Sequence, residues 1–368
     1  MLADERRQAI LRAVEREGSI TVKDLAAEMG VSAVTLRQDV RELAGRGLLA
    51  RVHGGARALA PAAETPAADR PAPAAVPSPT SAAGEAYVIG LVVPPGGYYY
   101  AEVIRGVQDA ARALGVRVVL AVSGESLAEN QEQVRQLTAG GIDGLLLMLH
   151  PGLSPLDEAE QWLSTLGVPA VLVERRVGPG AGRLEQVTSD HAYGAALAVR
   201  HLAGLGHDKV ALVARVESPN TPLLSAGWAE AVQAMDLAPG PEYLISTADD
   251  AAPADARFEK VVRAVEEGEV RAALVHNDID AIALVGILRA RGLRVPEDLA
   301  LVTYDDEVAE LSEVPLTAVA PPKQAVGAWA LDLAVRRLSA PAMPLAEILL
   351  RPELRVRASC GADRGATA

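Results

Sequence analysis

Cysteine and aromatic residues are scarce in this 368-residue sequence, and long apolar runs are missing from it. The single cysteine, Cys360, excludes a disulfide within the chain and a metal cluster built on cysteine. No run approaches the roughly 20 apolar residues of a membrane-spanning helix. No apolar stretch follows a basic N-terminus, as it does in a secretory signal. We therefore expect a cytoplasmic protein with no membrane partner.

Charge is distributed unevenly along the chain. The net charge is −13, which argues against a protein that coats nucleic acid with its whole surface. Residues 1–57, however, contain 10 Lys and Arg against 8 Asp and Glu, a balance of +2, which leaves −15 for the remainder. A mildly basic head on an acidic body indicates that only the head contacts DNA.

Composition divides the chain into three zones. Residues 1–57 are rich in helix-forming residues, whereas residues 58–86 are almost all Ala, Pro, Ser, Thr and charge, which predicts a semi-extended linker. Residues 87–368 alternate short apolar runs with helical patterns. This alternation predicts an α/β fold of doubly wound parallel sheets, long enough for two lobes. The predicted strands are 87–93, 116–122, 143–149, 169–173, 209–214, 272–275 and 299–304.

The head is predicted to be a helix-turn-helix domain followed by a short hairpin. Apolar residues recur at helical spacing in the segments 4–17, 21–29 and 32–44, and Gly30 marks the tight turn between the second and third helices. The segment 47–59 is typical of a hairpin, which would be the wing of a winged helix domain.

Basic and polar residues gather on one face of the third helix. Arg37, Gln38 and Arg41 fall opposite its apolar stripe, where they can contact base edges or phosphates in the major groove. A solvated helix face is the alternative. Arg51 and His53 on the predicted wing would contact backbone phosphates.

The head resembles the DeoR-type helix-turn-helix domain. The resemblance is carried by ERRQAIL (5–11) and ITVKDLAAEMGVSAVTLRQDVRELAGRGLLARVHGGA (20–56). It implies a winged helix-turn-helix whose partner is double-stranded operator DNA. By this resemblance the contacts of the recognition helix are Ser32, Thr35, Arg37, Gln38 and Arg41.

Aromatic and polar residues follow several predicted strands of the third zone, where ligands of doubly wound sheets bind. Tyr98, Tyr99 and Tyr100 are three of the 11 aromatic residues, and their rings suit stacking on a sugar or base, or packing between lobes. Carboxylates and amides suit polyol hydroxyls, although charged residues also pair with each other in water. The polar residues after the other strands are Glu174, Arg175, Arg176, His276, Asn277, Asp278, Asp305 and Asp306.

The third zone resembles the sensor domain of the LacI family, which is similar to periplasmic sugar-binding proteins. The most specific stretches are GHDKVALV (206–213) and RVPEDLALVTYDD (294–306), and the resemblance spans nearly all of 87–358. It implies a two-lobed, periplasmic-binding-protein-like sensor. It also implies a ligand pocket formed by Tyr99, Tyr100, Glu174, Arg175, Asn277 and Asp305, with Asn220 and Asp278 as weaker candidates.

The sequence departs from the LacI pattern in four places. The segment 246–256 has no aromatic residue for stacking, and the segment 215–224 is expected to lack the arginine that some relatives present to the ligand. Position 174 is Glu where Asp is frequent. Nothing in 58–86 resembles the hinge helix of that family. We therefore expect ligand-driven lobe closure to act by changing the spacing of two DNA-binding heads.

Signatures of catalysis are missing. The sequence contains no GxxxxGK[ST], GxSxG or HExxH motif, and its six histidines are not at metal-ligand spacing. We therefore expect no enzyme activity, no cofactor and no metal. A transport-type binding protein is the second alternative, against which the head and the missing signal argue.

These observations predict a ligand-responsive DNA-binding transcription regulator. We expect a repressor that a sugar or sugar-like effector releases from its operator. A homodimer is expected because paired heads recognise paired half-sites. The remaining alternative is a DNA-binding regulator whose sensor domain serves only dimerisation, or binds a non-sugar effector such as a nucleoside.

Overall fold

The chain separates into two compact units, Met1–Pro77 and Ser78–Ala368, in the computed structural model of this protein. No helix among the described residues is long and apolar enough to cross a lipid bilayer. The residues that the structure describes are 10, 13, 19–21, 25, 29, 36, 50–52, 55–57, 87–95, 99–124, 126–149, 156–177, 184–246 and 254–362.

The unit Met1–Pro77 contains a three-stranded antiparallel sheet. Its strands are β1 (Ser19–Thr21), β2 (Ala50–Val52) and β3 (Gly55–Arg57), in the order β1-β3-β2. The pair β2–β3 is the hairpin that the sequence predicts over 47–59. The described helical residues Ile10, Leu25 and Leu36 are buried, as the helical spacing of apolar residues predicts.

Strand β1 corrects the predicted start of the second helix. The sequence predicts that this helix begins at residue 21, but Thr21 lies in β1 and pairs with Gly55 of β3. The adjacent Ile20 pairs with Ala56. Both residues are β-branched, and such side chains pack well on a pleated surface, which favours a strand at this position.

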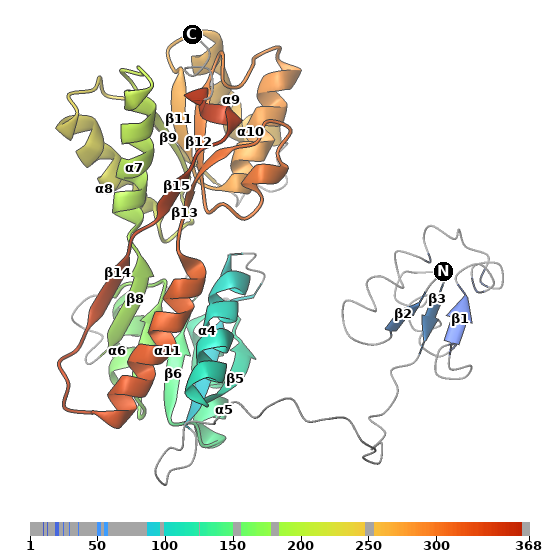
Figure 1. Ribbon diagram of the computed structural model, residues 1–368, viewed down its shortest axis with the longest axis vertical. Coiled ribbons are helices and arrows are strands. Elements are labelled where there is room, and N and C mark those ends of the chain that lie inside the picture. Colours follow the sequence, from blue (N-terminus) through green and yellow to red (C-terminus); the bar gives the residue numbers. More distant parts are fainter. Residues whose placement is uncertain are drawn as a thin grey trace, which may run out of the picture. The chain divides into compact units, whose positions relative to one another are not determined.

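The unit Ser78–Ala368 consists of two lobes, each built on a six-stranded sheet (Figure 1). In the first lobe all strands are parallel, in the order β14-β8-β7-β6-β4-β5. They are β4 (Val88–Val93), β5 (Arg117–Val122), β6 (Gly144–Leu147), β7 (Ala170–Val173), β8 (Glu185–Ser189) and β14 (Glu347–Leu350). The helices of this lobe are α4 (Tyr100–Leu114), α5 (Leu127–Ala139), α6 (Leu156–Ser164) and α11 (Lys323–Ser339).

The second lobe repeats this arrangement, in the order β10-β9-β11-β12-β13-β15, with only β15 antiparallel. Its strands are β9 (Ala211–Arg215), β10 (Glu242–Ile245), β11 (Ala272–Val275), β12 (Ala300–Tyr304), β13 (Thr317–Ala320) and β15 (Glu353–Arg355). The helices are α7 (His191–Gly204), α8 (Thr221–Ala234), α9 (Ala254–Glu266), α10 (Asp278–Ala290) and the short 3-10 helices η2 (Ala309–Leu311) and η3 (Ala358–Cys360).

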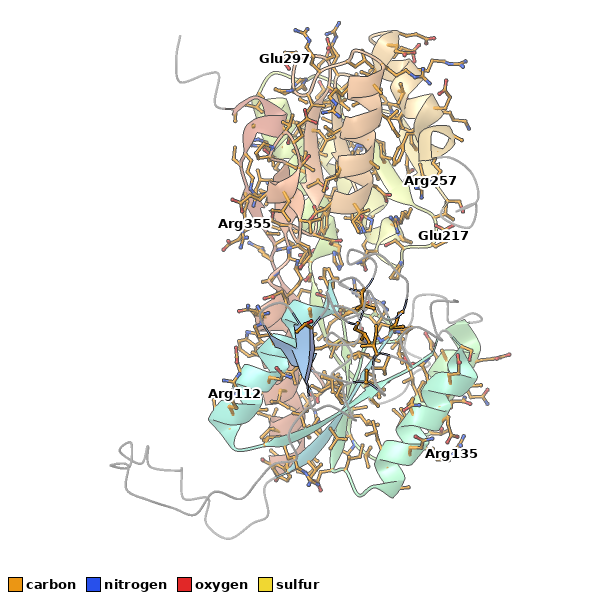
Figure 2. All side chains as sticks on the ribbon, turned by 90° about the vertical axis from the view of Figure 1, so that its right-hand side faces the viewer. Arg112, Arg135, Glu217, Arg257, Glu297 and Arg355 are labelled. Carbon is orange, nitrogen blue, oxygen red and sulfur yellow. The ribbon has the colours of Figure 1, made fainter. Side chains whose placement is uncertain are left out.

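The central strands of both sheets are buried on both faces. Every residue of β6, β7, β11 and β12 is buried, because helices cover both sides of each sheet. All seven predicted strands are present within about two residues of their predicted ends. Charged side chains cover the outside of both lobes, as Arg112 on α4 and Arg135 on α5 do (Figure 2). The predicted two-lobed α/β fold is thus confirmed.

Three chain segments connect the lobes. The chain passes from β8 to α7 at Asp190, from β13 to α11 at Pro321 and Pro322, and from β14 to β15 at Arg351 and Pro352. Figure 1 shows these crossings at the waist between the two sheets. Because all three segments cross between the lobes, motion of one lobe against the other must bend all three. We call these three segments the hinge.

Helices α4 and α11 pack closely together, and this contact positions the residues at their starts near the hinge. A Cβ atom on Gly106 of α4 would lie 2.0 Å from the carbonyl oxygen of Gln324, and one on Gly327 of α11 would lie 2.1 Å from that of Val103. Only glycine allows this approach of the two backbones. The contact holds the start of α11, with Lys323, next to the start of α4, with Tyr99.

Candidate functional site

Several sequence-predicted site residues lie at the carboxyl ends of parallel strands, and some of these lie at the switch points of the two sheets. In each lobe the strand order is that of a doubly wound sheet, with β4 between β5 and β6, and β9 between β10 and β11. Ligands of such sheets bind beyond the carboxyl ends of the strands at this reversal. Tyr99 and Tyr100 follow β4, and Asn277 follows β11. The fold thus brings aromatic side chains in the first lobe and an amide side chain in the second to the carboxyl-terminal edge of the parallel strands.

Glu174 follows β7 and is buried, although the sequence suggests a residue that faces the ligand. Its carboxylate accepts hydrogen bonds from the Tyr99 hydroxyl at 2.7 Å, the Ser189 hydroxyl at 2.7 Å and the Ser189 backbone N–H at 3.0 Å. His191 Nε2 lies 3.5 Å from the same carboxylate. The backbone φ of Glu174 is 54°, in the left-handed region, where a residue other than glycine is held by its surroundings.

These contacts keep Glu174 ionised. Burial raises the pKa of its carboxyl, but the hydrogen bond and charge of His191, together with the two Ser189 bonds, outweigh burial and lower the pKa to about 2. Burial and the neighbouring Glu174 and Asp305 charges raise the pKa of Tyr99 well above its ordinary value. A fixed carboxylate thus faces a hydroxyl that remains protonated.

Arg175 fixes the second tyrosine. Its Nη2 donates to the Tyr100 hydroxyl at 2.6 Å, its Nε to the Leu149 carbonyl at 2.6 Å and its Nη1 to the Glu174 carbonyl at 2.6 Å. The Tyr99 and Tyr100 rings meet edge to face, with centroids 5.6 Å apart. The aromatic pair is therefore preorganised, which lowers the entropy cost of binding against it.

The second lobe contributes three consecutive polar residues after β11. His276, Asn277 and Asp278 are all buried, and no protein partner contacts His276 Nδ1, Asn277 Oδ1 or Asp278 Oδ1 by hydrogen bond among the described residues. Burial, with the nearby His191 charge, lowers the pKa of His276 to about 3, so its ring is neutral. Unpaired buried acceptors are costly and favour a ligand or water that donates to them.

Asp278 also supports the loop that follows β12. Its Oδ2 accepts from the backbone N–H groups of Glu307 at 2.6 Å and Val308 at 3.0 Å. Burial raises the pKa of Asp278 to about 6, against these two bonds and with the help of the Asp305 charge. This carboxylate therefore positions the turn that carries Asp305.

Asp305 lies where the lobes meet. Its backbone φ of 93° turns the chain sharply, and its carbonyl accepts a hydrogen bond from Lys323 Nζ. Lys323 also pairs with Glu307 and lies 5.0 Å from the centre of the Tyr99 ring. The side chain of Asp306, by contrast, is buried and pairs with Arg355 and Arg357, each at 2.7 Å, so it stabilises the fold of its own lobe.

Sequence reasoning missed several residues of this region. Ser189 and His191 lie at the first hinge segment and Tyr304 ends β12. Arg215, the first residue of the segment expected to offer no arginine, ends β9 and forms a two-point ion pair with buried Asp280, one contact at 3.0 Å. Only the ends of strands β8, β9 and β12 could have indicated these residues, and β8 had not been predicted.

Other predicted residues are less informative. Asn220 is half-buried at the start of α8, where its backbone N–H donates to the Ser218 hydroxyl at 3.3 Å. In the head, Arg51 pairs in register with Ala56 through the backbone. The predicted DNA contacts Ser32, Thr35, Arg37, Gln38, Arg41 and His53, the linker residues 58–86 and Tyr98 lie outside the described residues.

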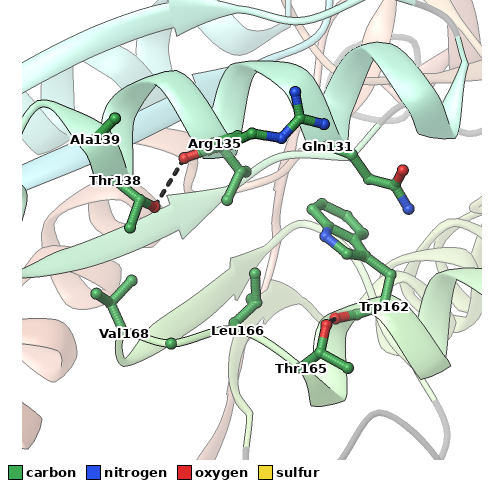
Figure 3. A pocket seen from close by; sticks show the side chains of 10 residues that line it. Gln131, Arg135, Thr138, Ala139, Trp162, Thr165, Leu166 and Val168 are labelled. Carbon is green, nitrogen blue, oxygen red and sulfur yellow. Dashed lines mark hydrogen bonds between the residues drawn. The ribbon is translucent and has the colours of Figure 1, made fainter.

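Two hollows differ in their relation to the hinge. One of about 600 Å³ is lined by residues of both lobes, including Glu102, Asp305, Lys323 and Arg355. Another of about 670 Å³ lies between α5 and the end of α6, where Trp162 faces the side of α5 (Figure 3). The lining of the second hollow includes the residues just before β7. These residues lie at the amino-terminal edge of the sheet, so this hollow faces away from the site. Among the described residues no group of three or more His, Cys, Asp or Glu side chains could hold a metal ion.

Comparison with known proteins assigns both parts of the chain. A DeoR-like helix-turn-helix domain model matches residues 6–62, and a periplasmic binding protein-like domain model matches residues 199–360. A LacI family transcriptional regulator from Enterococcus faecium, solved with bound ribose, has a TM-score of 0.60 at 22% identity, over 74% of this chain and 98% of that one. The lac repressor dimer bound to operator has a TM-score of 0.62 at 24% identity, over 75% and 94%.

A relative in sequence decides the family. The HTH-type transcriptional regulator CelR of Thermobifida fusca is 31% identical over 270 residues, which are 71% of this chain and 76% of CelR. The chain belongs to the LacI family of transcriptional regulators. In this chain the matched head is of the DeoR-like type. A second relative is the arabinose metabolism transcriptional repressor of Geobacillus stearothermophilus. It is 26% identical over 351 residues, which are 92% of this LacI family chain and 90% of the repressor.

Proposed function

We propose that this LacI family regulator is a repressor whose two-lobed unit binds a small carbohydrate effector, and whose head binds double-stranded operator DNA. The observation that carries the proposal is the convergence of aromatic and polar side chains at the switch points of both lobes, next to the hinge. An effector held between the lobes stabilises one hinge angle over the others, which is the basis of ligand control.

The chemistry of the two walls supports a polyhydroxylated effector. Among the described residues no protein donor reaches Asn277 Oδ1 on the second lobe, and this acceptor suits the hydroxyl donors of a sugar; His276 Nδ1 beside it is likewise without a hydrogen-bond partner there. Tyr100 on the first lobe offers an aromatic face beside the Arg175 guanidinium. The relatives support the same class, since one is named for arabinose metabolism and one was solved with ribose.

The predicted pocket residues then divide into two roles. We assign effector contact to Tyr99, Tyr100, Arg175, Asn220, Asn277 and Asp305. The Glu174 carboxylate and Asp278 Oδ2 accept hydrogen bonds from protein donors, and these two residues act by positioning Tyr99 and the Asp305 turn. The domain limits of the proposal are a DNA-binding head at 1–57, a linker at 58–86 and a sensor at 87–368.

The DNA-binding half of the proposal rests on the head. Recognition-helix residues Ser32, Thr35, Arg37, Gln38 and Arg41 contact the major groove, and Arg51 and His53 contact phosphates. The working form is a homodimer, because two half-sites need two heads. The edge strand β5 supports a dimer, since its Leu120 and Val122 are about half exposed, and apolar residues on a free strand edge favour pairing. Effector-driven lobe motion changes the distance between the heads.

The exposed β5 edge also favours the second candidate function, in which the sensor unit serves only to dimerise the heads. Ligand binding separates the two. The full chain is melted against pentoses, hexoses, disaccharides, polyols, nucleosides and sugar phosphates, with Asn277→Ala as the matched variant. A ligand at one hundred times its Kd adds about 2.7 kcal/mol to stability.

The melting panel has three informative results. A sugar that stabilises the wild-type chain and not the variant supports the carbohydrate sensor. A nucleoside that stabilises the wild type and not the variant shows that the effector is a nucleoside and not a carbohydrate. If no compound changes the melting temperature and the protein is a dimer, the result supports a sensor unit that serves only dimerisation.

A further inference from the structure

A row of buried polar side chains crosses the hinge beside the proposed effector site. It begins at the Tyr99 hydroxyl in the first lobe, passes through the Glu174 carboxylate and the His191 imidazole, and ends at the Tyr304 hydroxyl in the second lobe. The side chains of Glu174 and His191 are 1% and 2% exposed, and Tyr304 is fully buried. Water therefore does not replace these contacts when one of them is lost.

His191 lies at the point of the row where the first lobe meets the second. It begins α7 at the first hinge segment, with Nε2 facing Glu174 at 3.5 Å and Nδ1 facing the Tyr304 hydroxyl at 3.1 Å. The imidazole contacts the carboxylate through one ring nitrogen and the tyrosine hydroxyl through the other. One ring thus joins a polar group of one lobe to a polar group of the other.

Tyr304 packs closely against α7. A Cβ atom on Gly194, one turn into α7, would lie 2.4 Å from the Tyr304 hydroxyl oxygen. The His276 ring also packs against Tyr304, with ring centroids 5.7 Å apart and an angle of 61° between the ring planes. The hydroxyl is therefore held on His191 by packing as well as by its hydrogen bond.

We infer that Glu174, His191 and Tyr304 form an interlobe link that couples the position of Tyr99 to the second lobe. They act as positioning residues, and the effector does not touch them. The inference rests on the proposed function, because the effector lies against the tyrosines that follow β4. When it moves Tyr99, the Glu174 carboxylate must follow or lose a buried hydrogen bond, and His191 passes the change to Tyr304.

A double-mutant cycle without any ligand tests the link. Tyr99→Phe and Tyr304→Phe each remove one hydroxyl at opposite ends of the row, and the melting temperature of the full chain is followed by tryptophan fluorescence. All three tryptophans, Trp162, Trp228 and Trp329, lie in the unit Ser78–Ala368, so the signal reports the unfolding of this unit. If the row is one network, the decrease in melting temperature of the double variant is smaller than the sum of the decreases of the two single variants, by about 3 °C or more.

Two further variants keep the result specific. Tyr100→Phe removes the neighbouring hydroxyl, which bonds to Arg175 outside the row. The decrease in melting temperature that it causes should simply add to the decrease caused by Tyr304→Phe. In a His191→Ala background the coupling between Tyr99→Phe and Tyr304→Phe disappears. Additive losses in the wild-type background, or coupling that persists without His191, overturn the inference. Because no effector is present, either result leaves the proposed sensor function to its own test.

Discussion

Replacement of Gly194 by alanine tests how tightly Tyr304 is held against α7. In an exposed helix interior, glycine to alanine stabilises by about 1 kcal/mol. At Gly194, however, the new methyl group would meet the Tyr304 hydroxyl oxygen at 2.4 Å and two ring carbons at 3.1 Å. Overpacking of a filled core costs about 1–3 kcal/mol. Because Tyr304 is fully buried and cannot swing into solvent, we expect a net loss, seen as a melting temperature lower by about 2–4 °C.

Two comparisons make this prediction specific. Gly286→Ala in α10 is the matched control, because nothing lies within 4 Å of its Cβ position, and it should raise the melting temperature. In a Tyr304→Phe background the closest atom is gone, so Gly194→Ala should cost much less. A Gly194→Ala variant that is as stabilised as Gly286→Ala would refute the argument.

Three other predictions concern charge, the effector and DNA. Glu174 has a pKa of about 2 against an ordinary 4.5, so the stability it contributes above pH 4.5 is lost as the pH falls toward 2; urea midpoints of Glu174→Gln should decline less over that window than those of the wild type. Asp305→Ala should abolish the melting shift with the effector yet retain operator affinity in fluorescence anisotropy, and loss of both would mean a structural role. Arg37→Ala or Arg41→Ala should weaken operator binding by about 1–3 kcal/mol in the same assay, and unchanged affinity in both would contradict the recognition-helix assignment.

The sequence predicts the strands that are apolar runs and misses those that are short or rich in polar residues. Strands β6, β7, β11 and β12 are largely apolar because helices cover both faces, so their pattern is unmistakable. The strands β10, β14 and β15 are short and partly exposed, β8 consists mostly of polar residues although most of them are buried, and β13 (TAVA) has one large apolar residue, so none of the five stood out from its surroundings.

The proposed site depends on contacts that a local sequence pattern does not show. The rule that ligands bind at strand ends points to Tyr99, Tyr100 and Asn277, and their contact with an effector stays a prediction. It could not show that Glu174 points into the protein, because its partners Ser189 and His191 come from an unpredicted strand and the hinge after it. Which side chain of a strand end faces the ligand and which holds the fold depends on contacts between distant segments, and these have no local pattern.

The central claim is that a carbohydrate bound between the lobes controls operator binding by the head. Its most direct test uses the full chain, an operator fragment selected from genomic DNA by the protein itself, and the sugar that stabilises the protein in the melting panel. Operator affinity is measured by fluorescence anisotropy with and without that sugar, for the wild type and for Asn277→Ala. The account predicts that the sugar weakens operator binding of the wild type at least tenfold and leaves that of the variant unchanged. Equal affinity of the wild type with and without the sugar would contradict it.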